Sequence, residues 1–146
     1  MSFYCNTGYN LLIAGYGSKH DFLHKFASEN LPNYPVIAVN GFINGLTTKY
    51  ILNKFCDFLK QSVSSGSSKM IEEKEKSSSK QIEAQLEYMK SMLDDEESDL
   101  KYNKVVFMVH SIDGKSLRNN EIQQILSIIA AMKRVLLYYV ISLQRK

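Results

Sequence analysis

Short apolar runs alternate along the chain with segments in which apolar residues recur every three or four positions. The runs are rich in branched and aromatic side chains, which is typical of strands buried on both faces of a parallel sheet; they span residues 10–14, 36–39, 104–109 and 135–142. The spaced segments predict amphipathic helices over 18–30, 47–60 and 119–132. This alternation predicts an α/β fold with a parallel, doubly wound sheet of four strands and flanking helices.

A polar segment interrupts this alternation in the middle of the chain. Residues 61–101 are rich in Ser, Lys and Glu, a low-complexity composition that buries too little apolar surface to offset the entropy of ordering. Within this insertion, four apolar residues at helical spacing predict a weakly docked helix over 80–93: Ile82, Leu86, Met89 and Leu93. We therefore expect a loose N-terminus at 1–9 and one domain in two parts, at 10–60 and 102–146.

Length and composition favour a single intracellular domain without a metal. The 146 residues and 45% hydrophobic content suit one ordinary core. Cys5 and Cys56 are far apart and lack CxxC spacing, so we expect a reducing compartment and no disulfide framework. His20, His24 and His110 lack the HExxH pattern, so the sequence predicts no metal site and no cofactor.

The sequence also argues against secretion and membrane insertion. The N-terminus has no basic segment followed by an apolar one, so we expect no signal peptide. The most apolar window spans 125–143, but Lys133 and Arg134 lie at its centre, where each would cost about 2.5–3.5 kcal/mol in a bilayer. This window is better interpreted as a helix, a turn and a buried strand.

The charge is unevenly distributed between the insertion and the remaining chain. The net charge of +3 combines a surplus of four acidic residues in 61–101 with a surplus of seven basic residues elsewhere. A basic folded part permits contact with nucleic acid, although many basic domains bind none.

A glycine turn follows the first apolar run. Gly15 and Gly17 flank Tyr16, and Ser18 with Asp21 fits a capping box, which predicts a helix that begins at Ser18. Such a helix aims its unpaired N–H groups at the turn, which is where parallel α/β proteins bind phosphate.

This turn is an incomplete phosphate-binding motif. A P-loop ends in Lys followed by Ser or Thr, whereas Lys19 is displaced and is followed by His20. A dinucleotide fingerprint would need glycine at His20. We interpret the turn as a degenerate nucleotide site or a partner contact; its residues are Gly15, Tyr16, Gly17, Ser18 and Lys19.

Polar and glycine residues also follow the second and third apolar runs. An active NTPase has Asp-Glu after the third strand, to hold Mg²⁺ and polarise water, but this run ends in His110-Ser111. Asp113 comes too late and is better interpreted as a turn residue than as a metal ligand. We therefore regard His110 and Asp113 as a vestigial Walker B region.

Several of these motifs, in this order, resemble the origin recognition complex subunit 2 family. They are Asn10-Leu11-Leu12, Gly15 to Lys19, Asn40-Gly41-Phe42, His110 to Gly114, Leu117-Arg118 and Gln124 to Leu126. The resemblance covers residues 10–60 and 103–142. It implies an AAA+-like, RecA-type domain of the P-loop NTPase class, with Asn40, Gly41, Phe42 and Arg118 as interface residues.

The resemblance also implies a function. It points to a structural, non-catalytic subunit in the nucleus that supports replication initiation by packing against other origin recognition complex subunits around duplex DNA, held mainly through phosphates. It implies no nucleotide hydrolysis and no membrane contact. The alternative is a small nucleotide-binding protein or NTPase that uses Gly15 to Lys19.

Two departures from the family pattern lead to further expectations. The insertion at 61–101 has no expected counterpart in the common core, and we expect these 146 residues to lack the fifth strand, helical lid and winged-helix domain that the family has downstream. We expect a fragment, a truncated gene model or a shortened relative in which the first strand forms a sheet edge.

Overall fold

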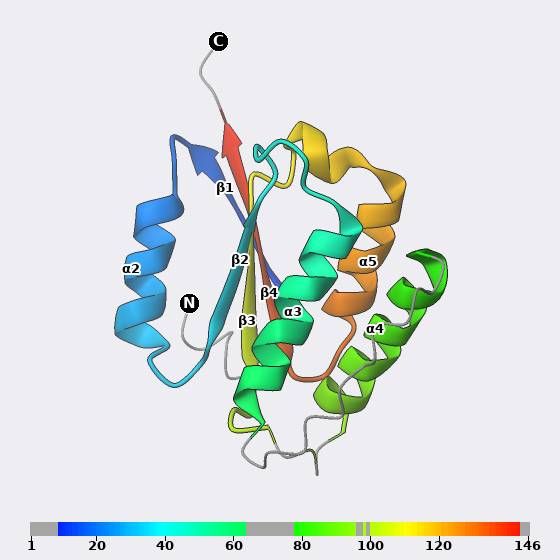
Figure 1. Ribbon diagram of the computed structural model, residues 1–146. Helices are drawn as coiled ribbons and strands as arrows, with labels where there is room; N and C mark the ends of the chain where they lie inside the picture. The colour runs from blue at the N-terminus through cyan, green and yellow to red at the C-terminus, as the bar shows by residue number, and fades with distance from the viewer. Residues whose placement is uncertain (1–8, 64–77, 96–97, 99, 144–146) are drawn as a thin grey trace.

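The computed structural model describes residues 9–63, 78–95, 98 and 100–143. Four parallel strands form one sheet in the order β1-β4-β3-β2 (Figure 1); they are β1 (Leu11–Tyr16), β2 (Val36–Asn40), β3 (Val105–His110) and β4 (Val135–Leu143). The predicted parallel α/β sheet is confirmed, with β1 at an edge. The loose N-terminus was expected at 1–9, and residues 1–8 lie outside the described residues. The Ser-rich insertion was expected at 61–101, and its residues 64–77 also lie outside the described residues.

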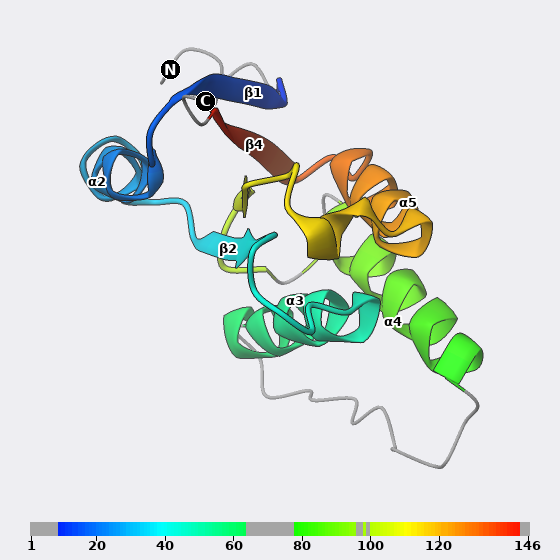
Figure 2. The ribbon, with the colours of Figure 1, turned by 90° about the horizontal axis from the view of Figure 1, so that it is seen from above.

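Helices cover both faces of the sheet. Figure 2 shows α2 (His20–Asn30) on one face and α3 (Thr48–Ser62), α4 (Ser78–Leu93) and α5 (Asn120–Ala130) on the other. A 3₁₀ helix, η1 (Lys115–Arg118), leads into α5. Among the described residues, no helix is long and apolar enough to cross a membrane.

Alternation along the strands produces two apolar cores. In β3, Val105, Phe107 and Val109 face α3 and α5, whereas Val106 and Met108 face α2. All five are at most 1% exposed. The central strands are therefore continuous apolar runs because both of their faces are buried.

The start of α3 agrees with the sequence prediction, whereas the start of α2 differs from it. Of the two threonines at the expected start, Thr47 and Thr48, it is Thr47 that caps α3: its side chain accepts a hydrogen bond of 3.2 Å from the N–H of Tyr50. The expected start of α2 at Ser18 was wrong, because the helix begins at His20 and Lys19 is its N-cap without a side-chain bond. The carboxylate of Asp21 lies 3.1 Å from the imidazole of His20 instead of closing a capping box.

The docking of α4 also differs from the expectation. This helix was expected to dock weakly over 80–93, but it packs along α3 and spans Ser78–Leu93. Met89 and Leu93 are fully buried in the core that α3 and α5 share. A hydrogen bond of 2.6 Å from Gln85 to Asn53 joins the two helices. α4 is therefore part of the folded core.

Candidate functional site: the carboxyl edge of the sheet

The motif residues singled out in the sequence follow the carboxyl ends of β1, β2 and β3, at one edge of the parallel sheet. Asn40 pairs in register with His110, and His110 pairs with Val140 of β4. The Gly15–Lys19 turn begins with the last two residues of β1, which lies on the far side of β4 from β3. In open parallel sheets, this carboxyl edge is where ligands bind.

The Gly15–Lys19 turn wraps around its own lysine. The Lys19 ammonium donates hydrogen bonds of 2.5, 3.2 and 2.9 Å to the carbonyl oxygens of Gly15, Tyr16 and Gly17. Gly17 has a φ of 74°, which favours glycine. The carbonyl oxygens of this turn therefore face a cation, whereas a phosphate cradle presents N–H groups.

The loops after β2 and β3 touch backbone to backbone. Gly41 donates a hydrogen bond of 2.9 Å to the carbonyl oxygen of His110. A Cβ atom on Gly114 would lie 2.4 Å from the Gly41 carbonyl, and one on Gly41 would lie 2.2 Å from the Ser111 oxygen. Side chains cannot fit between these loops, which explains glycine at both positions.

Asp113, Arg118 and Phe42 lie on the outer side of these loops. Arg118 donates a hydrogen bond of 3.0 Å from its Nε to the backbone carbonyl of Asp113, while the Asp113 carboxylate points to no described cation. Phe42 is 59% exposed and Ile43 is 51% exposed. The Asn40 side chain accepts a hydrogen bond from the Phe42 N–H, which fixes this exposed corner.

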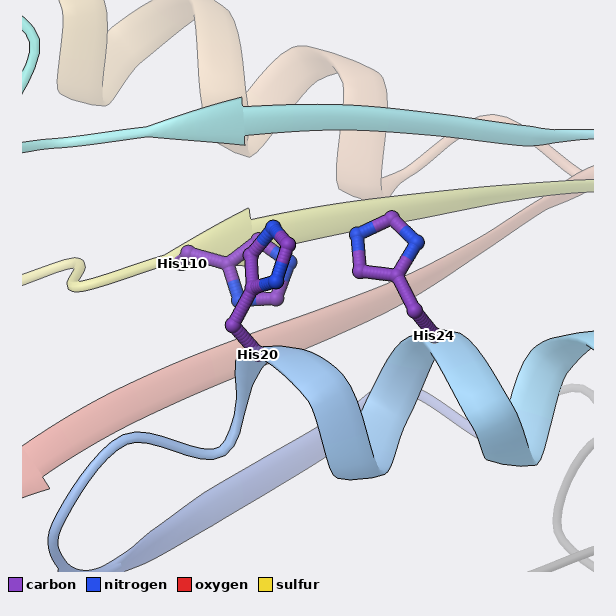
Figure 3. Close-up of side chains that lie close together, drawn as sticks. All are labelled: His20, His24 and His110. Carbon is purple, nitrogen blue, oxygen red and sulfur yellow. The ribbon is translucent and has the colours of Figure 1, made fainter.

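Three histidines meet beside the same loops. His20 and His24 lie one turn apart on α2 and His110 lies at the end of β3, and Figure 3 shows their rings gathered in the space between the two elements. One ligand nitrogen from each residue lies within 4.8 Å of the other two. Ser111, which follows with a φ of 52°, turns the chain sharply away after His110.

Burial affects the protonation of His110, the buried member of this cluster. His110 is 5% exposed and its Nε2 has no hydrogen-bond partner. Burial, followed by the neighbouring His20 and His24, lowers the pKa of His110 from 6.5 to about 4. His110 is therefore a neutral imidazole at neutral pH.

The structure brings some of the expected residues together and keeps others apart. Asn40, Gly41, His110 and Asp113 belong to adjoining loops, whereas β4 separates the Gly15–Lys19 turn from them. Sequence reasoning missed the contact of His110 with α2. The spacing of His20 and His24 was a visible signal, but the third imidazole comes from a distant strand.

Comparisons with known proteins identify the family. The model of the "Origin recognition complex subunit 2 RecA-like domain" matches residues 1–142. The chain is 27% identical over 137 residues to "Origin of replication complex subunit 2" of Oryza sativa subsp. indica and 30% identical over 131 residues to "Origin recognition complex subunit 2" of Drosophila melanogaster. These matches cover 91% and 89% of this chain, but only 35% and 18% of those relatives.

Solved structures agree with the sequence comparisons. A chain of Drosophila ORC bound to AT-rich DNA and Cdc6 is similar with a TM-score of 0.69 and 29% identity, over 97% of this chain and 43% of that chain. A chain of Drosophila ORC bound to DNA is similar with a TM-score of 0.67 and 28% identity, over 97% and 71%. Because the family model spans nearly the whole sequence and the RecA-like sheet is present, the chain belongs to the origin recognition complex subunit 2 family.

Proposed function

We propose that this chain is a structural, non-catalytic subunit of a nuclear origin recognition complex that contributes to origin binding and replication initiation. The observation that carries the proposal is the family match over residues 1–142. The chain spans about a third or less of the relatives named above, so this role concerns the RecA-like domain. It packs against sibling subunits, and duplex DNA is the shared ligand.

The Gly15–Lys19 turn supports a role without nucleotide hydrolysis. Its lysine is bonded to three carbonyl oxygens of the turn, so the cation that a P-loop directs at phosphate is engaged within the turn. β3 ends in His110 instead of the acidic pair that holds Mg²⁺ and polarises water. We therefore regard this turn and the region of His110 and Asp113 as degenerate forms of the two nucleotide motifs.

Exposed apolar side chains near the carboxyl edge supply a contact surface for sibling subunits. Phe42 and Ile43 project from the loop after β2, and Tyr16 at the end of β1 is 67% exposed. Aromatic side chains are enriched among the residues that dominate protein interfaces. We propose that Phe42, together with Asn40, Gly41 and Arg118, forms one such contact.

Charge supports contact with DNA through phosphates. Outside residues 61–101 the sequence carries seven more basic than acidic residues. Such a surplus favours binding to the DNA backbone, directly or as part of an assembly, and makes binding weaken as salt increases.

Co-purification tests the subunit role. The chain is co-expressed with the other origin recognition complex subunits of its organism, and we expect it to co-purify with them. Phe42→Asp should weaken this association about tenfold or more, the effect of losing one interface anchor. Phe22→Asp, at a residue of α2 that is 60% exposed, is the matched control. A wild-type chain that melts cooperatively but joins no subunit would contradict the proposal.

Nucleotide binding tests the non-catalytic role. Calorimetry with ATP and Mg²⁺ should show no saturable binding, and ATP should leave the melting temperature unchanged. Micromolar binding that raises the melting temperature would favour the NTPase alternative.

A further inference from the structure

Three imidazoles converge on one point from two separate elements of the fold. The ring centroids of His20 and His24 are 4.3 Å apart, those of His20 and His110 are 4.9 Å apart, and those of His24 and His110 are 5.7 Å apart. These are all the histidines in the sequence. Every imidazole of the sequence therefore lies in the same space between α2 and β3.

The buried member of the cluster lacks a partner within the protein. The Nε2 of His110 is buried without a hydrogen bond, which ordinarily costs about 1–3 kcal/mol. A bound ligand that accepts its lone pair would satisfy this nitrogen. A neutral imidazole nitrogen is the form of histidine that coordinates a metal ion.

The other two histidines can adjust to such a ligand. Both are exposed and lie on one face of α2, at positions i and i+4. The carboxylate of Asp21 lies 3.1 Å from Nδ1 of His20, a contact that holds a proton on Nδ1 and leaves Nε2 to coordinate. In tetrahedral zinc sites, nitrogen ligands lie about 2.0–2.1 Å from the ion, so rotation of these two side chains must draw the three nitrogens together from their present spacing.

We propose that His20, His24 and His110 bind one divalent transition-metal ion of the zinc type, with a fourth position left for water or another ligand. Neutral imidazoles favour Zn²⁺, Ni²⁺ and Cu²⁺, whereas Mg²⁺ and Ca²⁺ prefer oxygen ligands. The ion would join the start of α2 to the end of β3. This proposal is independent of the replication role, because its tests need neither DNA nor other subunits.

Metal titration of the chelator-treated chain of 146 residues is the first test. Calorimetry should show one Zn²⁺ bound per chain, with a dissociation constant on the order of 1 μM or lower, and no binding of Mg²⁺. Zinc at a hundred times that constant should raise the melting temperature by roughly 5–10 °C. Co²⁺ should give the intense visible absorption of a four-coordinate site without a thiolate charge-transfer band. Absence of saturable zinc binding would overturn the proposal.

Single substitutions assign the ligands. His20→Ala and His24→Ala alter exposed residues and should each weaken zinc binding at least about tenfold. Lys25→Ala, at the next exposed position of α2, and Cys5→Ser, which removes a thiol, should leave the affinity unchanged. Zinc affinity that survives both histidine substitutions would overturn the site.

The role of His110 as a ligand is tested first in the wild-type chain, because substitution of a buried residue can unfold the protein. In the wild-type chain, zinc should shift the ring ¹⁵N resonances of all three histidines at the same stoichiometry. An unshifted His110 resonance would show that this residue is not a ligand and would contradict the three-histidine site. His110→Gln, where it melts cooperatively, should lose zinc affinity at least about tenfold.

Discussion

At the residue scale, Cys56 makes stability sensitive to alkaline pH. Burial raises the pKa of its thiol from 9.0 to about 11, with Lys60 and Asp57 acting in opposite directions. The unfolded chain loses this proton before the folded chain does, so stability is complete below pH 9 and falls as pH rises from 9 to 11.

We expect this thiol to contribute a loss of about 2–3 kcal/mol across that interval. Urea unfolding at several pH values, compared between wild type and Cys56→Ala, measures it, because the variant should have a shallower slope. Burial also raises the pKa of Tyr88 and Tyr139, so part of the slope should persist in the variant. Identical slopes in the two proteins would contradict this assignment.

The contact between the loops after β2 and β3 depends on a missing side chain. A Cβ on Gly41 would meet the Ser111 backbone oxygen at 2.2 Å, so Gly41→Ala should destabilise the fold by about 3 kcal/mol. Gly45→Ala is the comparison, because a Cβ on Gly45 would have open space around it. Its only cost is the left-handed backbone conformation, with a φ of 79°, which should destabilise the fold by about 1–2 kcal/mol. Chemical denaturation of both variants checks the order, and a larger loss at Gly45 would refute the steric explanation.

The sequence predicts only part of the histidine cluster. The spacing of His20 and His24 indicates a shared helix face, but a pattern search for HExxH rejects them as metal ligands. That pattern contains a general base, which a binding site does not require. The third imidazole belongs to β3, and its approach to α2 follows from packing that no local pattern contains.

At the scale of single elements, substitutions at the starts of α3 and α2 should lower the stability by different amounts. Thr47→Ala removes the bond to the Tyr50 N–H and should cost about 0.5–2 kcal/mol. Ser18→Ala should cost less than about 0.5 kcal/mol, because Ser18 is not the N-cap of α2 and its Oγ accepts only a long hydrogen bond of 3.4 Å from the His20 N–H. Thermal melts compare the two variants. Equal losses of stability would indicate that Ser18 caps α2, as the sequence predicts.

The helix α4 makes a second prediction at this scale. Leu93 is fully buried, so Leu93→Ala should destabilise the whole domain by about 2–5 kcal/mol. Lys90→Ala, on the exposed side of the same helix, should have little effect. Urea unfolding measures both, and a Leu93 variant with wild-type stability would indicate that α4 is peripheral.

The elements differ in how well their sequences predicted them. Continuous apolar runs located all four strands. Burial on both faces explains the run in β3, whereas β1 is an apolar run of which one face is exposed. The periodicity of Ile82, Leu86, Met89 and Leu93 indicated a helix, but the surrounding serine and glutamate residues suggested weak docking. The apolar face of α4 is buried by α3 and α5, so the composition around α4 alone could not predict its burial.

At the scale of the whole molecule, one side of β1 is uncovered. Leu11 and Ile13 pack toward α2, whereas Leu12 is 64% exposed on the opposite face. An exposed apolar edge strand favours association with other chains. Leu12→Lys should reduce concentration-dependent association of the purified chain in sedimentation experiments, without lowering its melting temperature. Unchanged association would show that this strand is not the contact.

The strand order has a consequence for how the protein is made. β4 is the last strand in the chain, yet it lies between β1 and β3 in the sheet. During synthesis, the first strand therefore leaves the ribosome more than a hundred residues before its neighbour exists. Its apolar side chains stay exposed for roughly 6–25 s at ordinary translation rates, an interval in which chaperones would protect the nascent chain.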